Sequence, residues 1–175
     1  MSKFTVKQLT LGAMVAALYV VLSYFGNVFS LTFGPIQFRF AEALTVLPFL
    51  FPSTVPGLFI GCLVTNLLSP YGPLDIVVGS LATLIAAFWT SRLKHKWLAP
   101  LPPVLCNTAL VGFTIGFAQT GFTAALPAAW AYNGLTVGVG ELGACYVLGM
   151  LLLYALPKIK LFHNMIPEGR LVSAA

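Results

Sequence analysis

Long apolar runs dominate this chain and restrict what it can fold into. The stretch Val104–Phe122, for example, contains no charged residue. A helix that crosses the hydrocarbon core of a bilayer needs about 20 mainly apolar residues. Of the 175 residues, 59% are hydrophobic and 7% are charged, whereas a soluble domain carries roughly 25% charged residues. The sequence therefore predicts an integral membrane protein, because too few polar residues remain to cover a water-facing surface.

Six apolar segments predict an all-α bundle of six transmembrane helices, which form a single membrane domain over residues 1–175. The segments are Leu9–Tyr24, Arg39–Phe51, Val55–Leu68, Leu74–Ser91, Val104–Phe122 and Leu135–Leu156. The second and third are short, and prolines stand at positions 48, 52 and 56, where each removes a backbone donor from a helix. These two segments fit either a pair of short tilted helices or a re-entrant pair.

The basic residues indicate the orientation of these segments, because cytoplasmic loops of membrane proteins are enriched in Lys and Arg. In a six-span arrangement, all basic residues except Arg39 fall on the side of the two termini: Lys3, Lys7, Arg92, Lys94, Lys96, Lys158, Lys160 and Arg170. We therefore expect both termini in the cytoplasm and a multi-pass protein of the cell membrane, in contact with lipid. Basic residues scattered in this way form no phosphate-binding face, so no nucleic-acid partner is expected.

Four charged residues depart from this topological pattern, since they lie within apolar segments or at their non-cytoplasmic ends: Arg39, Glu42, Asp75 and Glu141. An ionised side chain at the bilayer centre costs about 2.5–3.5 kcal/mol and is retained where it pairs or lines a polar cavity. Uncharged polar residues at similar depth are Gln37, Asn66, Tyr71 and Asn133. Together these residues predict a substrate pocket open to the outside. A structural ion pair, Arg39 with Glu42, is the alternative for those two residues alone.

The first segment carries two overlapping pairs of small residues, Gly12 with Ala16 and Ala13 with Ala17. Small residues four apart let another helix approach closely within a membrane. This strip is either a docking face for a partner membrane subunit or an internal packing face. The motif alone slightly favours internal packing.

The chain lacks the motifs of a motor or an enzyme. It has no G-x-x-x-x-G-K-[ST] phosphate loop, and its two histidines lie in a predicted link and in the tail. Its three cysteines lack the spacing of a metal site. We therefore expect a binding protein rather than an enzyme, with no metal and no cofactor.

Three stretches resemble a known family: IQFRFAEALTVLPF (Ile36–Phe49), TNLLSPYGPLDIVVGSLATLIAA (Thr65–Ala87) and NGLTVGVGEL (Asn133–Leu142). They are similar to the queuosine-precursor transporters, which are substrate-binding S components of energy-coupling factor (ECF) transporters. The resemblance implies a six-helix bundle in a prokaryotic plasma membrane that binds a deazaguanine base. It also implies a transmembrane T component and two cytoplasmic ATPases as partners, with Ala13 and Ala17 on the surface that docks the T component.

The resemblance also implies roles for the predicted pocket residues. Glu141 or Glu42 would accept the two adjacent donors of the base, its ring N–H and its exocyclic amine. Asp75 would hold an ammonium if the ligand carries one, and Arg39 would orient Glu42 or donate to the carbonyl of the base. Tyr71 is a candidate for stacking on the ring, Asn66 and Asn133 for completing its edge, and the loop Asn27–Ile36 for covering the pocket.

Three alternatives remain open. The first is an S component for another small heterocyclic nutrient or vitamin. The second is a solitary carrier coupled to protons through Glu42 or Glu141. The third is a structural subunit that has no ligand.

Overall fold

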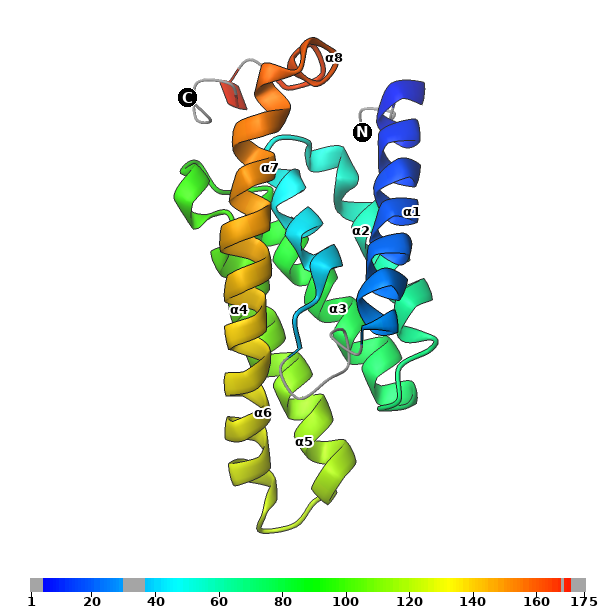
Figure 1. Cartoon of the computed structure of the whole chain (residues 1–175), viewed down its shortest axis with the longest axis vertical. Helices are drawn as coiled ribbons and strands as arrows, with labels where there is room; N and C mark the ends of the chain where they lie inside the picture. The colour runs from blue at the N-terminus through cyan, green and yellow to red at the C-terminus, as the bar shows by residue number, and fades with distance from the viewer. Residues whose placement is uncertain (1–4, 30–36, 168, 171–175) are drawn as a thin grey trace.

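The computed structural model describes residues 5–29, 37–167, 169 and 170, and throughout these residues the regular structure is helical (Figure 1). The elements are α1 (Val6–Val28), η1 (Phe40–Phe49), η2 (Pro52–Thr54), α2 (Val55–Asn66), α3 (Pro73–Thr90), η3 (Lys96–Leu98), α4 (Leu101–Cys106), η4 (Asn107–Val111), α5 (Gly112–Thr120), α6 (Leu126–Glu141), η5 (Leu142–Gly149), α7 (Met150–Ala155), η6 (Leu156–Lys158) and α8 (Lys160–His163).

Four helical stretches are long and apolar enough to cross a membrane. They are Val6–Val28, Pro73–Thr90, Lys96–Thr120 and Leu126–Lys158. The second and third predicted segments form shorter helices, η1 with 10 residues and α2 with 12 residues. The chain is therefore an all-α membrane protein, as its sequence predicts.

The last long helix begins earlier than its sequence suggests, at Leu126 rather than Leu135. Pro127 stands in its first turn, where a missing backbone donor costs nothing. Residues 128–134 are less hydrophobic than the rest of this helix, so hydropathy alone assigns them to a loop. Glu141 consequently lies about four turns into the helix, deeper than the turn and a half that a start at Leu135 would give.

The short helix η1 lies at the centre of the bundle (Figure 1). Every residue from Ala41 to Phe49 is buried, so η1 has no face left for lipid. It is a 3-10 helix with Pro48 near its end. The rise of about 2.0 Å per residue in a 3-10 helix carries ten residues roughly 20 Å. This central position brings Arg39 and Glu42 into the interior.

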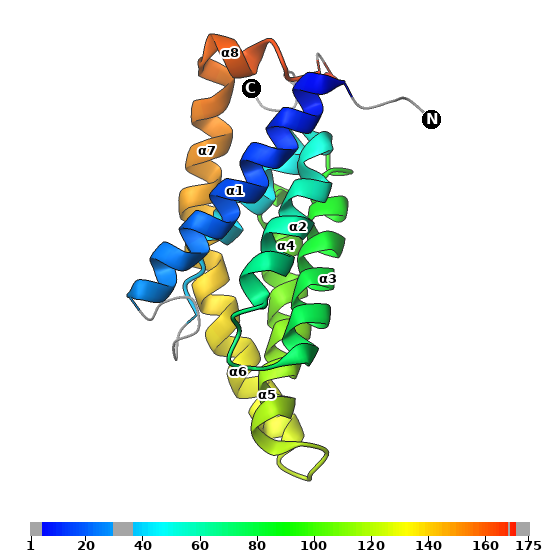
Figure 2. The same cartoon turned by 90° about the vertical axis from the view of Figure 1, so that its right-hand side faces the viewer.

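Helix α1 packs directly on α2, as both views show (Figures 1 and 2). A Cβ atom added at Gly61 would lie 2.8 Å from Tyr19 Cβ and 2.9 Å from the carbonyl oxygen of Ala16. A Cβ atom added at Gly57 would overlap the backbone of Gly12. Only small residues allow this approach, which places the Tyr19 side chain inside the bundle.

Helices α5 and α6 form an apolar hairpin that extends past the other helices at one end of the molecule (Figures 1 and 2). The two helices are also closely packed, since a Cβ atom added at Gly112 would lie 2.6 Å from the Cα atom of Gly134. The Gly134–Gly140 region therefore serves helix packing.

Both ends of the described chain lie at the opposite end of the bundle (Figure 1). There, Arg170 Nη1 donates to the carbonyl oxygens of Phe49 and Leu93, at 3.1 and 2.9 Å, and Nη2 donates to that of Ser91. Its guanidinium also lies 5.8 Å from the centre of the Phe49 ring. Arg170 thus joins the ends of η1 and α3 to the C-terminal region, in addition to carrying a topological charge.

Candidate functional site

The first turn of η1 places a buried ion pair inside the bundle. Arg39 and Glu42 are 2% and 0% exposed, and Arg39 Nε lies 3.9 Å from Glu42 Oε1. Their spacing of three residues puts both side chains on one face of the helix, as the sequence predicts. Because both charges have left water, each depends on the partners that the bundle supplies.

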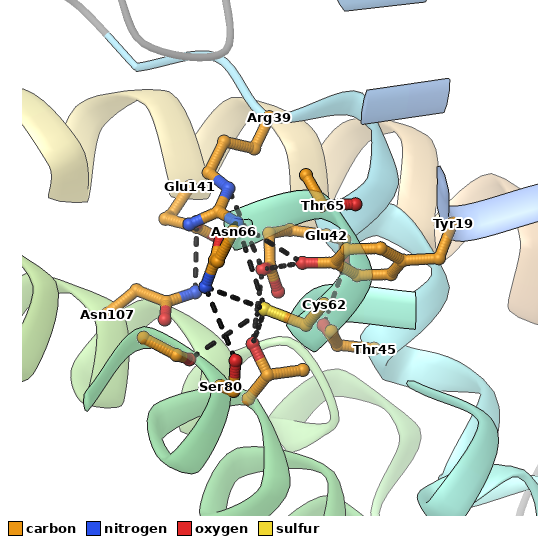
Figure 3. A network of polar contacts seen from close by, with 12 residues as sticks. Tyr19, Arg39, Glu42, Thr45, Cys62, Thr65, Asn66, Ser80, Asn107 and Glu141 are labelled. Atoms are coloured by element: carbon orange, nitrogen blue, oxygen red, sulfur yellow. Dashed lines mark hydrogen bonds and ion pairs between the residues drawn. The ribbon is translucent and has the colours of Figure 1, made fainter. Parts of the chain in front are cut away.

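Glu42 receives two hydroxyl groups in addition to Arg39. The Tyr19 hydroxyl donates to Glu42 Oε1 at 2.5 Å and accepts from Arg39 Nη2 at 3.5 Å (Figure 3). The Thr83 hydroxyl lies 3.4 Å from the same carboxylate oxygen. The carboxylate is therefore held from α1, η1 and α3 together.

Asn66, at the end of α2, connects this pair to the start of α3. Its Oδ1 accepts from Arg39 Nη2 at 3.2 Å (Figure 3). Its Nδ2 lies 3.3 Å from the backbone oxygen of Asp75 and 3.5 Å from Ser80 Oγ. A Cβ atom added at Gly79 would lie 2.8 Å from that amide nitrogen, so the glycine leaves room for Asn66.

Glu141 reaches the same region from the other side of the bundle. Its side chain is 0% exposed, and its Oε1 accepts from Asn107 Nδ2 at 3.0 Å (Figure 3). Both residues stand where a π-helical stretch begins, η4 at Asn107 and η5 immediately after Glu141. Such wide turns are rare and are frequent at functional sites.

Close backbone contact brings the segment just before η1 against α6 at this point. A Cβ atom added at Gly140 would overlap the backbone of Gln37, so glycine is required there. The thiol of Cys145 lies between η1 and α6, 3.4 Å from both the Glu42 backbone oxygen and Glu141 Oε2. We call Tyr19, Arg39, Glu42, Asn107 and Glu141 the deep cluster.

A second polar group surrounds the link between α2 and α3. Asp75 is 1% exposed, and its Oδ2 accepts from the Ser69 hydroxyl at 2.5 Å. Gln37 Nε2 donates to the Tyr71 hydroxyl at 3.3 Å. Burial raises the pKa of Tyr71, so its phenol stays neutral at physiological pH. We call Gln37, Ser69, Tyr71 and Asp75 the link cluster; Asn66 joins it to the deep cluster.

Several buried polar atoms of these clusters have no hydrogen-bond partner within the described residues. They are Arg39 Nε, Glu42 Oε2, Asp75 Oδ1 and Asn107 Oδ1. Buried polar groups are almost always hydrogen-bonded, and each exception calls for an explanation. Three of these four atoms are oxygens that accept hydrogen bonds, so the site offers acceptors to a molecule that enters it.

The structure gathers most, but not all, of the predicted pocket residues. Seven of them lie in the two clusters or join them: Gln37, Arg39, Glu42, Asn66, Tyr71, Asp75 and Glu141. Asn133 does not, because its Nδ2 donates to Gln119 Oε1 at 2.8 Å and to the Ala129 backbone oxygen at 2.7 Å. Asn133 thus lies apart from the two clusters and joins α5 to α6, and its role as a pocket residue stays a prediction.

Sequence reasoning missed two members of the deep cluster, Tyr19 and Asn107. Asn107 had a visible signal, since it is an amide within the uncharged segment Val104–Phe122. Tyr19 had none, because tyrosine is common in membrane helices. The predicted covering loop, Asn27–Ile36, lies largely outside the described residues, at positions 30–36.

The small residues of α1 divide between two faces. Gly12 is buried and Ala16 is half-buried, and both face α2, which is the internal-packing alternative. Ala13 and Ala17 are exposed. A groove of about 380 Å³ runs between α1 and α2, lined by Gln8, Leu9, Gly12, Ala13, Ala16, Ser53, Pro56, Gly57 and Ile60. Gly12 and Ala16 thus serve the packing of α1 on α2 and also line this groove, whereas Ala13 and Ala17 are exposed.

Comparison with known proteins agrees with the resemblance seen in the sequence. A family model described as QueT transporter matches residues 9–158. A protein named queuosine precursor transporter QueT, from Lactococcus lactis subsp. cremoris, is 35% identical over 120 residues, which are 65% of this chain and 68% of that protein. No solved structure matches the chain.

Proposed function

Because the chain belongs to the QueT transporter family, we propose that it is the substrate-binding subunit of an ECF-type importer and that it captures a queuosine precursor, a deazaguanine base. The observation that carries this proposal is the pair of clusters, which combine three carboxylates, one guanidinium and two amides inside an apolar bundle. A membrane protein retains such groups where they serve a substrate pathway or a binding site.

The deep cluster supports recognition of a deazaguanine edge. The base carries two adjacent donors, a ring N–H and an exocyclic amine, which match two parallel acceptors. Glu141 presents a buried carboxylate next to the amide of Asn107, whose Oδ1 has no hydrogen-bond partner among the described residues. Glu42 Oε2 is a further acceptor of the same kind. We assign Glu141 the principal contact, because its hydrogen-bond partners, Asn107 and Cys145, are neutral, whereas Glu42 already pairs with the Arg39 cation.

In this proposal the chain forms one domain that crosses the plasma membrane six times, with both termini in the cytoplasm. The described basic residues of the α3–α4 link and of the C-terminal region support this orientation. Helices η1 and α2 would be the second and third spans. The exposed face at Ala13 and Ala17 would dock the T component. Two cytoplasmic ATPases would hydrolyse the ATP that drives transport, since the given sequence contains no phosphate-loop motif.

Binding by the purified protein in detergent tests the site. We expect 7-deazaguanine derivatives to raise the unfolding temperature selectively over B vitamins, because a ligand that prefers the native state stabilises it. Glu141→Gln should abolish that shift while the variant remains folded. Tyr132→Phe, at an exposed position of α6, is the matched control. An unchanged affinity of Glu141→Gln would remove Glu141 from the site.

Uptake measurements test the ECF assignment separately. Cells that express this chain should accumulate labelled substrate only when the T component and the ATPases are present. Uptake that persists without the ATPases would reject the ECF assignment in favour of a solitary carrier. Stabilisation by a B vitamin, with no response to any deazaguanine, would instead indicate an S component for another nutrient.

A further inference from the structure

We propose that the tip of the α5–α6 hairpin lies among the lipid head groups, at the membrane surface farther from the two termini. A second aromatic cluster, near the other end of the same long helix, marks the opposite membrane surface. This inference goes beyond the proposed function, because it assigns the position of the bundle in the bilayer and needs no substrate. It rests on the length of that helix, on the aromatic side chains near its ends, and on the lack of exposed charge between them.

The last helical stretch is too long to be hidden in the hydrocarbon core. It runs from Leu126 to Lys158, which is 33 residues, and at 1.5 Å per residue it measures about 50 Å. The core is about 30 Å thick. A tilt that kept the whole stretch inside the core would exceed about 50°, whereas membrane helices tilt by about 0–40°. This stretch also follows the long axis of the molecule (Figure 1), so part of it stands outside the core.

Exposed aromatic side chains stand near both ends of this stretch. Trp130 and Tyr132 are exposed on the hairpin, and Trp97 and Tyr154 are exposed near the other end. The rings of Trp97 and Tyr154 lie 6.2 Å apart, and Lys96 Nζ lies 4.5 Å from the centre of the Tyr154 ring. Trp and Tyr are enriched where a membrane meets water, and a lysine there keeps its ammonium in water. The two aromatic pairs therefore mark two membrane surfaces.

The spacing of the two pairs matches the thickness of the core. Tyr154 follows Tyr132 by 22 residues, which is about 33 Å of helix. Glu141 is the charged residue between them in the sequence, and it is buried. The large exposed side chains of this interval are all apolar: Leu135, Val139, Leu142, Val147 and Leu151. The interval from Tyr132 to Tyr154 therefore fits the hydrocarbon core, with lipid tails against its exposed face.

The tip of the hairpin then falls in the head-group layer. Leu126 precedes Tyr132 by six residues, or about 9 Å of helix, and each head-group layer is about 5–8 Å thick. Phe122 lies in the turn between α5 and α6, is 84% exposed, and packs against Phe117 with ring centres 4.7 Å apart. The sequence between Lys96 and Glu141 contains no charged residue, so nothing in the tip requires bulk water. Lipid is the partner that suits such an apolar, aromatic projection.

This placement also gives the depth of the deep cluster. Glu141 follows Tyr132 by nine residues, which puts it about 14 Å inside the core, close to the middle of the bilayer. The buried pair of Arg39 and Glu42 lies in the same cluster. Ionised groups are most costly at this depth, so the bundle keeps its charges where contact with lipid would be least favourable.

Fluorescence quenching tests the placement, because the chain has three tryptophans: Trp89, Trp97 and Trp130. Trp89→Phe with Trp97→Phe leaves Trp130 alone, and Trp89→Phe with Trp130→Phe leaves Trp97 as the matched comparison. Each variant is reconstituted in phosphatidylcholine vesicles that carry bromine either near the head group or near the end of the acyl chain. Both tryptophans should lose more emission to the shallow bromine than to the deep one. Iodide in the water should quench Trp130 less than it quenches free tryptophan.

Three results would overturn the inference. Quenching of Trp130 by iodide alone would place the hairpin in water, and stronger quenching by the deep bromine would place it in the core. Protection of Trp130 from every quencher would mean that protein covers the tip, such as a second copy of this chain. If a double variant does not fold, wild-type protein labelled with fluorotryptophan gives the same depths by fluorine NMR with paramagnetic lipids. Failure to bind any deazaguanine would reject the proposed function and leave these depths unchanged.

Discussion

Glu42 and Asp75 are carboxylates of one connected polar network, yet the protein treats them differently. Glu42 has a guanidinium 3.9 Å away and a tyrosine hydroxyl at 2.5 Å, and α1, η1 and α3 all contribute to its surroundings. Asp75, in the first turn of α3, accepts from the hydroxyl of Ser69, six residues earlier in the chain. Each carboxylate keeps one oxygen without a hydrogen-bond partner among the described residues, but only Glu42 is held by a cation and by several elements of the bundle.

Of these substitutions, Arg39→Ala should lower the free energy of unfolding most. The substitution leaves Glu42 buried without its cation, and removal of one partner of a buried pair costs about 3–5 kcal/mol. We expect a large loss of stability in chemical unfolding of the detergent-solubilised protein. The double variant Arg39→Ala with Glu42→Ala should recover part of the loss. A stability equal to that of the wild type would show that the pair does not hold the fold.

Tyr19→Phe should cost less, about 1–3 kcal/mol, because it removes one donor from a buried charged acceptor. The same unfolding measurement applies. Tyr24→Phe is the matched control, since Tyr24 lies on the same helix and is exposed. Equal effects of the two substitutions would mean that the contact between Tyr19 and Glu42 contributes nothing to stability.

Ser69→Ala makes the corresponding deletion at the other carboxylate. We expect a smaller loss, about 0.5–1.5 kcal/mol, since no cation of the described residues lies within 4.0 Å of Asp75. The comparison between Tyr19→Phe and Ser69→Ala is the direct measure of the difference between the two carboxylates. If Ser69→Ala were the more destabilising of the two, Asp75 and not Glu42 would be the carboxylate on which the fold depends more.

Asp75→Asn should have the smallest effect on the ligand-free protein, within about 1 kcal/mol, because it removes a buried charge that forms no ion pair with any described residue. Thermal unfolding without ligand checks this expectation. A loss as large as that of Arg39→Ala would show that Asp75 is a structural residue.

The sequence allowed the charged members of the site to be identified, because ionisable residues within apolar segments are rare and conspicuous. It also allowed the all-α membrane class and the family to be predicted. It did not predict the contact between Tyr19 and Glu42, which depends on how closely Gly61 lets α1 approach α2. Nor did it separate Asn133 from Glu141. The two share α6 but lie about two turns apart, and the partner that holds Asn133, Gln119, is visible only in the folded hairpin.

The contacts of Arg170 have a consequence for the order in which the chain acquires its structure. The carbonyl oxygens of Phe49, Ser91 and Leu93 belong to segments that leave the ribosome early, whereas Arg170 follows every membrane helix in the chain. Since synthesis proceeds from the N-terminus, η1 and α3 enter the membrane before Arg170 can form hydrogen bonds to these carbonyl oxygens. Their final linkage is a late event of biogenesis, and a nascent chain halted after α7 would lack it.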